Sequence, residues 1–159
     1  MASEANDNTE VPELPLWRPH TLPATTHSYL LRAAESLSEA VAATDAATRY
    51  ACAHVAALRA AAALLAARAR PTPGQRRRQQ NAWALLAQVA PEMEEWATFF
   101  AAGAAKRAAA EAGSSRAASD READDLVRDA DRFLAVVERA LGLSEHPPVG
   151  DRLAGRAAG

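Results

Sequence analysis

Apolar residues recur along most of the chain at the spacing of amphipathic helices. In the last such stretch the apolar positions fall three or four residues apart, at Leu126, Ala130, Phe133, Val137 and Leu141. This spacing places them all on one face of a helix. The same pattern predicts five helices, at residues 26–43, 45–69, 79–90, 91–113 and 119–142. We expect four of them to form the core of a bundle and the short 79–90 segment to be an extra helix.

Local signals mark several of these helix ends. Ser119 and Glu122 form an S-x-x-E capping box, in which each side chain satisfies a backbone N–H at the start of a helix. Pro91 cannot continue the interior of a helix, but it can open the next one. Gly103 has no side chain, so we expect a neighbouring helix to approach closely there. These signals predict where the helices of the bundle begin and pack.

The two ends of the chain differ in composition from the bundle. Prolines at positions 12, 15, 19 and 23 disfavour helix, so residues 1–24 are predicted to form an extended or disordered arm. Residues 144–159 are rich in proline, glycine and arginine and are predicted to form a disordered tail. The bundle is assigned to residues 25–143, with a flexible connection at 70–80.

The composition supports an all-α domain. The chain has 159 residues, of which 49% are hydrophobic and only 5% aromatic, and alanine is its commonest residue. These features favour helices over strands and allow a single core. The net charge of -2 gives the molecule no overall attraction to nucleic acid or membranes, so any such contact needs a local patch.

Several classes of protein are disfavoured by what the sequence lacks. Cys52 is the only cysteine, which rules out an internal disulfide and suits a reducing cytoplasm. The N-terminus has neither the basic start nor the apolar run of a signal peptide, and no stretch approaches the roughly 20 uninterrupted apolar residues of a membrane span. The sequence carries no phosphate loop, dinucleotide fingerprint, metal motif or nucleophile elbow. We therefore expect a cytoplasmic protein with no membrane contact, no metal and no cofactor.

One segment, Arg49 to His54 on the second predicted helix, has chemical potential. An arginine can stabilise a phosphorane-like charge while a histidine moves a proton near neutral pH, so the pair could cleave RNA without metal. However, five helical steps of about 100° place the two residues roughly 140° apart around the helix. Arg49 is expected to face solvent or a subunit boundary. His54 shares its face with Tyr50 and Leu58, which favours a hydrogen-bonded core histidine over a catalyst.

The predicted connection carries three consecutive arginines, Arg76, Arg77 and Arg78. Clustered arginines bind phosphates, so this run could contact nucleic acid. No aromatic residues alternate with the arginines, and the rest of the chain is acidic. A solvated connection is therefore the favoured interpretation, with phosphate contact as the alternative.

The segments RYACAHVAALRAAAALLAARARP and WALLAQVAPEMEEWATFFAAGAAKRAAAEAG resemble an actinobacterial branch of the HEPN superfamily. The branch is named after a Streptomyces avermitilis representative and is known only as a HEPN domain-containing group. The resemblance covers about residues 27–143 and implies a compact helical bundle that is commonly dimeric. The superfamily includes metal-independent ribonucleases with an R-x4–6-H motif, in which an arginine and a histidine from each subunit meet across the dimer.

Arg49 and His54 match that motif with four intervening residues. Two departures count against ribonuclease activity. Tyr50 stands where the ribonucleases commonly have a polar residue, and the match lies on an early helix rather than in the later half of the domain. The superfamily also holds non-catalytic members that bind partners or nucleic acids.

The resemblance therefore implies a HEPN-like, non-catalytic interaction module. It also implies a homodimer with an unidentified protein partner and a link to RNA or nucleotide-dependent stress systems. The alternative is a metal-independent ribonuclease, with Arg49 holding phosphate and His54 acting as acid and base. The alternative requires His54 to reach solvent or a dimer cleft, whereas a core histidine should be enclosed by neighbouring helices.

Overall fold

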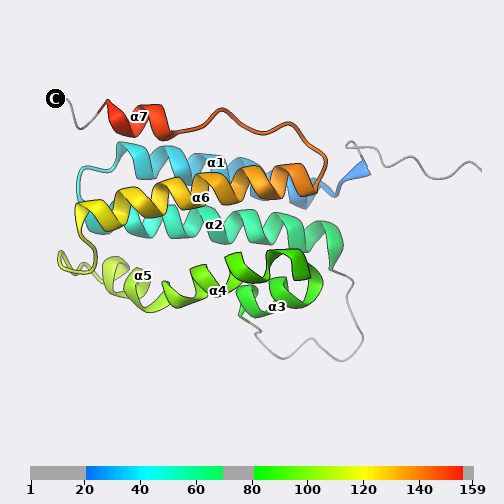
Figure 1. The fold of residues 1–159 in the computed structure, drawn as a ribbon, viewed down its shortest axis with the longest axis horizontal. Coiled ribbons are helices and arrows are strands. Elements are labelled where there is room, and N and C mark those ends of the chain that lie inside the picture. The colour runs from blue at the N-terminus through cyan, green and yellow to red at the C-terminus, as the bar shows by residue number, and fades with distance from the viewer. Residues whose placement is uncertain (1–20, 70–80, 156–159) are drawn as a thin grey trace, which may run out of the picture.

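The computed structural model describes residues 21–69 and 81–155 of the chain. These residues form α1 (Ala24–Ala42), α2 (Ala46–Arg68), α3 (Ala82–Val89), α4 (Glu94–Ala102), α5 (Ala104–Glu111), α6 (Asp120–Ala140) and α7 (Gly150–Ala154), arranged as in Figure 1. A 3-10 turn, η2 (Pro91–Met93), precedes α4. The described residues form no strand, which confirms the all-α class.

Helix α2 lies at the centre of the bundle, where it packs along α1 and α6 and also contacts α3 and α5 (Figure 1). Ala53, Ala57, Ala60 and Ala61 on α2 have no exposed surface, and their small side chains let neighbouring helices approach closely. By length and composition, α2 is the one described helix that could cross a membrane. Half of its apolar stretch is buried inside the bundle, as expected of a core helix.

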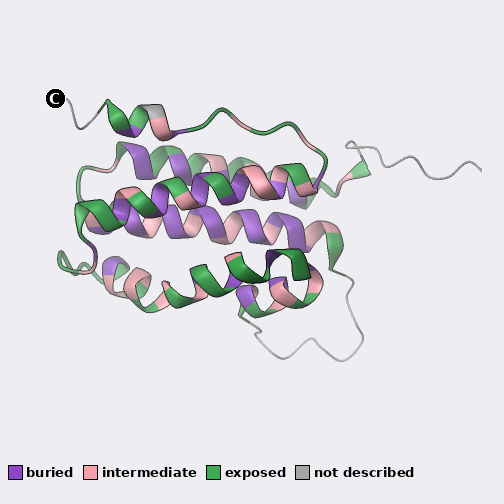
Figure 2. Cartoon of the chain, viewed as in Figure 1, coloured by how far each residue is buried: buried purple, intermediate pink, exposed green. Residues whose placement is uncertain are grey.

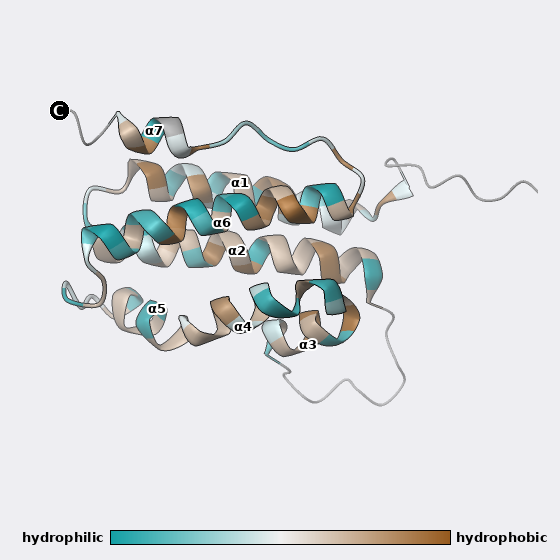
Figure 3. Cartoon of the chain, viewed as in Figure 1, coloured by the Kyte–Doolittle hydropathy of each residue, from teal (hydrophilic) through white to brown (hydrophobic). Residues whose placement is uncertain are grey.

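The predicted starts of two helices are confirmed. Asp45 caps α2 by accepting a hydrogen bond from the backbone N–H of Thr48 at 2.8 Å. Ser119 and Glu122 form the complete capping box of α6, with N···O distances of 3.1 and 2.8 Å. Figure 3 shows hydrophilic and hydrophobic residues alternating along α6, as the sequence pattern predicts for an amphipathic helix. These features depend on residues close in sequence.

The prediction of one continuous helix over residues 91–113 is wrong. The structure replaces that helix with η2, α4 and α5, and Gly103 separates α4 from α5. A Cβ atom on Gly103 would lie 2.8 Å from the Tyr50 hydroxyl oxygen and 3.4 Å from His54 Cδ2. The close helix approach expected at Gly103 is therefore confirmed. Glycine is also a poor helix former, so a break costs less there than elsewhere in the segment.

Four aromatic side chains join α3, α4 and α6. Trp83 stacks on Phe100 with ring centroids 5.1 Å apart, and Phe133 lies 5.2 Å from Phe100. Trp96 contacts Phe100 and Phe133 at centroid distances of 6.0 and 5.4 Å. Figure 2 shows that buried residues concentrate along α2 and the inward face of α6, whereas α4 and α5 present many exposed residues outward. The core thus extends from α2 across to the aromatic cluster.

The C-terminal segment differs from the predicted disordered tail at 144–159. Residues 144–155 are described, α7 forms within them, and Val149 and Leu153 join the core with only 2% and 5% of their surface exposed. The prediction failed because composition carries no information about contacts with distant residues on α6. Residues 1–20, which make up most of the predicted arm, the connection at 70–80 and residues 156–159 lie outside the described residues.

Candidate functional site

Arg49 is buried, with 5% of its surface exposed, and its guanidinium group binds within the chain. Nη1 donates to Asp124 Oδ1 at 3.0 Å and to Asp120 Oδ1 at 3.3 Å, both on α6. Nη2 donates to the backbone carbonyls of Ala43 and Thr44, each at 3.4 Å. Arg49 therefore ties the α1–α2 connection to the first turns of α6. The expectation that Arg49 faces solvent or a subunit boundary is wrong, because these partners are brought to it from 71 and 75 residues away.

His54 is enclosed on a different side of α2. Only 1% of its surface is exposed, and Nε2 lies 2.9 Å from the carbonyl oxygen of Phe100 on α4. Its ring meets the rings of Trp83 and Phe100 edge-on, with centroids 6.0 and 6.1 Å apart. His54 is therefore a hydrogen-bonded core residue, as its position on the apolar face predicts.

The protonation of His54 follows from the same contacts. Burial lowers the pKa of His54, and the hydrogen bond to Phe100 opposes this shift only in part. Since a carbonyl oxygen can only accept, the neutral ring carries its proton on Nε2 and donates it to Phe100. The other nitrogen, Nδ1, is buried without a hydrogen-bond partner. Neither nitrogen is available to exchange a proton with a substrate.

The contacts of Arg49 and His54 confirm that the two residues do not share a face. Arg49 binds α6, whereas His54 binds α4 and packs on α3. A general acid or base must come within hydrogen-bond reach of the proton it moves, and a phosphate-binding arginine needs free N–H donors that face the ligand. Within one chain, these two residues make no joint site.

A small cavity of about 370 Å³ opens beside Gly103, between α2, α4 and α6. Phe99 lines it and keeps 46% of its surface exposed. Lys106 also lines it, lies 5.9 Å from the Tyr50 ring centroid and binds Glu122 on α6 at 2.6 Å. That hydrogen bond from Lys106, together with the one from the Ser119 backbone N–H, lowers the pKa of Glu122 to about 2. The cavity therefore has aromatic walls and one cation that is already paired.

The C-terminal segment is held by His146, a residue outside every site predicted from the sequence. Its Nδ1 binds the carboxylate of Glu138, and its Nε2 binds Asp131 Oδ1 at 2.5 Å. The backbone N–H of Val149 donates to the other oxygen of Asp131 at 3.2 Å. The hydrogen bond to Asp131, reinforced by Glu138, raises the pKa of His146 to about 9 despite partial burial. The imidazolium at neutral pH therefore donates to both carboxylates.

One signal in the sequence could have pointed to the contacts of His146 with Asp131 and Glu138. Asp131 falls between Val127 and Leu134 at helical spacing, so it stands on the buried face of α6, where a carboxylate needs a partner. The sequence does not say which residue supplies that partner.

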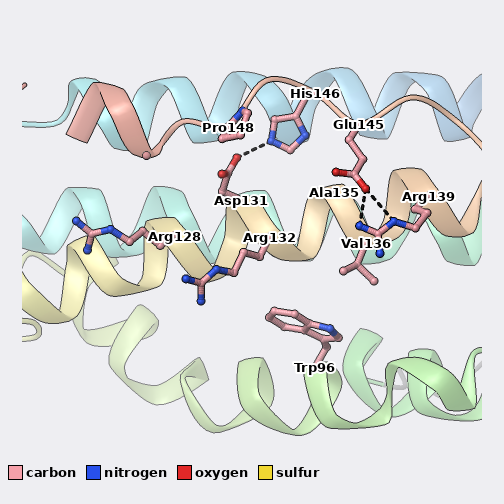
Figure 4. Close-up of a pocket in the computed structure, with 11 residues that line it drawn as sticks. Trp96, Arg128, Asp131, Arg132, Ala135, Val136, Arg139, Glu145, His146 and Pro148 are labelled. Carbon is pink, nitrogen blue, oxygen red and sulfur yellow. Dashed lines mark hydrogen bonds and ion pairs between the residues drawn. The ribbon is translucent and has the colours of Figure 1, made fainter. Parts of the chain in front are cut away.

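A second cavity, of about 530 Å³, lies over the outer side of α6 between the C-terminal segment and α4. Figure 4 shows Arg128, Arg132 and Arg139 along α6, with the indole of Trp96 on the opposite wall. Glu145, from the C-terminal segment, accepts a hydrogen bond from Arg139 Nε at 2.8 Å and so closes part of the wall that this segment forms. We call this cavity the α6 groove.

The described residues contain no group of three or more histidine, cysteine or acidic side chains that could hold a metal ion. Asp131 and Glu138 do surround His146, but they bind opposite nitrogens of its ring and so do not converge on one point. The predicted basic run, Arg76, Arg77 and Arg78, lies outside the described residues.

These features define an all-α bundle whose α2 arginine and histidine are enclosed by neighbouring helices. Comparison with protein families identifies it further: the SAV_6107-like HEPN family model matches residues 40–138, and the chain belongs to this family. No curated protein and no solved structure matches the chain. The matched region ends before Glu145 and His146, so the C-terminal wall of the α6 groove lies outside it.

Proposed function

We propose that this HEPN domain is a non-catalytic interaction module that acts in the cytoplasm. One observation carries the proposal: both pairs with R-x4–6-H spacing, Arg49 with His54 and Arg139 with His146, are already bound to groups of the same chain. In the second pair, Arg139 binds Glu145, and His146 binds Asp131 and Glu138. Arg49 is committed to Asp124 and to backbone carbonyls, and His54 is committed to Phe100. These contacts support a structural role for both residues.

The alternative is a metal-independent ribonuclease. That function would require a large rearrangement of the helices around His54. In such an enzyme His54 must reach the 2′-hydroxyl or the leaving oxygen of RNA, yet its surface is 1% exposed. Dimer formation by itself does not uncover a histidine that is enclosed by Trp83 and Phe100 of its own chain. The enclosure therefore counts against the alternative.

An RNA-cleavage assay tests the proposal. The purified chain is incubated with labelled single-stranded RNA and with total RNA, each with and without a chelator, and should leave both intact. The same assay is run on Arg49→Lys and His54→Asn, with Arg121→Ala as a matched surface control. Metal-independent cleavage that both folded variants lose, and the control retains, would falsify the non-catalytic proposal.

Self-association is part of the same proposal. The described residues expose two large apolar side chains, Leu31 at 63% and Phe99 at 46%. Phe99 borders the cavity beside Gly103, so a second copy placed there would cover apolar surface on both molecules. Light scattering of the protein at tens of micromolar should give a dimer mass. The substitution Phe99→Ser should lower the measured mass more than Leu31→Ser does. A monomer mass for the unaltered chain contradicts this part of the proposal.

The link to RNA or to nucleotide-dependent stress systems comes from the family resemblance, and Arg76, Arg77 and Arg78 are the residues that could make the contact. Contact of that kind is electrostatic and should weaken as salt rises through physiological strength. Replacing the three arginines by serine should abolish binding of a fluorescent RNA oligonucleotide at low salt and leave thermal stability unchanged. Binding that survives the replacement places the contact elsewhere on the chain.

A further inference from the structure

The α6 groove presents a row of guanidinium groups on one helix face. Arg128 and Arg132 are four residues apart, which separates their backbone positions by about 6 Å along the axis. Arg139 lies eleven residues beyond Arg128 and returns to the same face after three turns. The side chains of these three residues are 44%, 69% and 70% exposed. Figure 4 shows Arg128 and Arg132 extending away from the α6 ribbon.

The three arginines differ in how firmly they are held. Arg139 binds the carboxylate of Glu145 through both Nε and Nη2. Arg128 and Arg132 each approach only one carboxylate, three residues away on α6, at 3.4 and 3.5 Å. Exposed pairs of this kind contribute little, and most of the five N–H donors of each guanidinium stay available. A carboxylate thus already occupies one of the three positions, and the other two remain accessible.

The opposite wall of the groove is apolar. Trp96 is half-buried against Phe100 and Phe133, and its indole also lines the groove. Ala135 and Val136 form part of the floor between the tryptophan and the arginines. A ligand in the groove would therefore meet cations on one side and an aromatic ring on the other.

We propose that the α6 groove binds an acidic segment of a partner protein in an extended conformation, with an acidic–apolar–acidic pattern. In an extended chain, alternate side chains point to the same side and lie about 7 Å apart, close to the spacing of Arg128 and Arg132. Two carboxylates would bind these arginines as Glu145 binds Arg139. The side chain between them points to the other side, where Trp96 lies. This inference rests on the proposed interaction function and specifies the chemistry of the partner.

The charges around the groove favour a peptide over RNA. Asp125, Asp129 and Glu145 stand among the arginines, and the whole chain has a net charge of -2. RNA carries a negative charge at every nucleotide, so its backbone would meet these carboxylates as well as the arginines. A peptide can place its two carboxylates opposite Arg128 and Arg132 alone.

Selection from a phage library of random dodecapeptides against the immobilised full-length chain tests this proposal. We expect enrichment of peptides in which two acidic residues flank one apolar or aromatic residue. The most enriched peptide is then synthesised with a fluorophore, and its affinity is measured by anisotropy. The double charge reversal Arg128→Glu and Arg132→Glu should weaken binding at least about tenfold, because each carboxylate would meet a like charge. Arg121→Glu, the same change outside the groove on the same helix, should alter affinity less than about twofold.

Circular dichroism melting establishes that the double variant folds, and Arg128→Gln with Arg132→Gln replaces it if it does not. Selection without an acidic pattern, or affinity that survives the double change, overturns the proposal. Stronger competition by a short single-stranded RNA than by excess unlabelled peptide also overturns it, in favour of a nucleic-acid groove. None of these results bears on RNA cleavage, so failure of the groove and failure of the non-catalytic proposal are separate outcomes.

Discussion

The Arg49–His54 segment of α2 and the α6 groove contrast in how their polar groups are used. On α2, an arginine and a histidine at a chemically suggestive spacing are buried and bound to distant parts of the same chain. In the α6 groove, two arginines with no motif spacing are exposed and held by single weak contacts. The comparison shows that motif spacing says nothing about accessibility, which packing decides. Substitutions on α2 should therefore alter stability, whereas those in the groove should alter binding.

The largest effect is expected at His54. His54→Ala should lower the free energy of unfolding by about 3 kcal/mol, because it opens a void between Trp83 and Phe100 and removes one of the two N–H groups donated to the Phe100 carbonyl. Urea denaturation followed by circular dichroism measures this loss. A change below about 1 kcal/mol would show that the ring is not part of the core packing.

The second-largest effect is expected in the pH dependence of the free energy of unfolding, which His146 sets. Its pKa is raised from 6.5 to about 9 on folding, so the folded chain holds this proton more tightly than the unfolded chain. The resulting stability is fully present below about pH 6.5 and is lost as pH rises through about 9. It amounts to about 2 to 3 kcal/mol for a partly buried ring.

His146→Gln isolates this contribution, since the amide cannot carry the charge. The unfolding free energies of the unaltered chain and His146→Gln should differ at about pH 6 and converge near pH 10. A difference that stays constant across this range would show that the charge of His146 does not hold the C-terminal segment to α6.

Arg49→Ala should cost about 2 kcal/mol, more than a surface arginine, because it removes the bonds that join the α1–α2 connection to α6. The cost stays below that of a fully enclosed ion pair, since the side chains of Asp120 and Asp124 are 84% and 37% exposed and can be solvated. Arg49→Met keeps most of the buried volume and should lose about half as much. Equal melting temperatures for all three proteins contradict this account of Arg49.

Gly103→Ala should cost about 1 kcal/mol, because the new methyl group meets the Tyr50 hydroxyl while alanine favours helix. Tyr50→Phe removes that hydroxyl, so the same substitution in a Tyr50→Phe background should be neutral or stabilising. Thermal melting of the four proteins forms a double-mutant cycle. An equal cost in both backgrounds would place the clash elsewhere.

The smallest effect is expected for Arg132→Gln in the α6 groove. Its side chain is 69% exposed and makes one contact at 3.5 Å, so the unfolding free energy should change by less than about 0.5 kcal/mol. A loss comparable to that of Arg49→Ala would remove the contrast between the two regions. Melting of Arg132→Gln beside Arg49→Ala makes the comparison directly.

The predictions from sequence succeeded where the causes are local. The starts of α2 and α6 depend on Asp45 and on Ser119 with Glu122, which act within one helical turn. The burial of His54 follows from its place on an apolar face. The division of the 91–113 helix at Gly103 was missed, because it reflects how closely α2 approaches, and that distance is a property of the assembled bundle.

By itself, the sequence determined the all-α class, the caps, the family and the separation of Arg49 from His54 around α2, because helical periodicity and capping act over a few residues. Only the tertiary structure decided that Arg49 is paired with Asp124, that His146 binds Asp131 and Glu138, and that the C-terminal segment walls a groove on α6. The physical reason is that these contacts join residues far apart in the chain. Their strength depends on burial and on distances of a few ångströms, which no local pattern records.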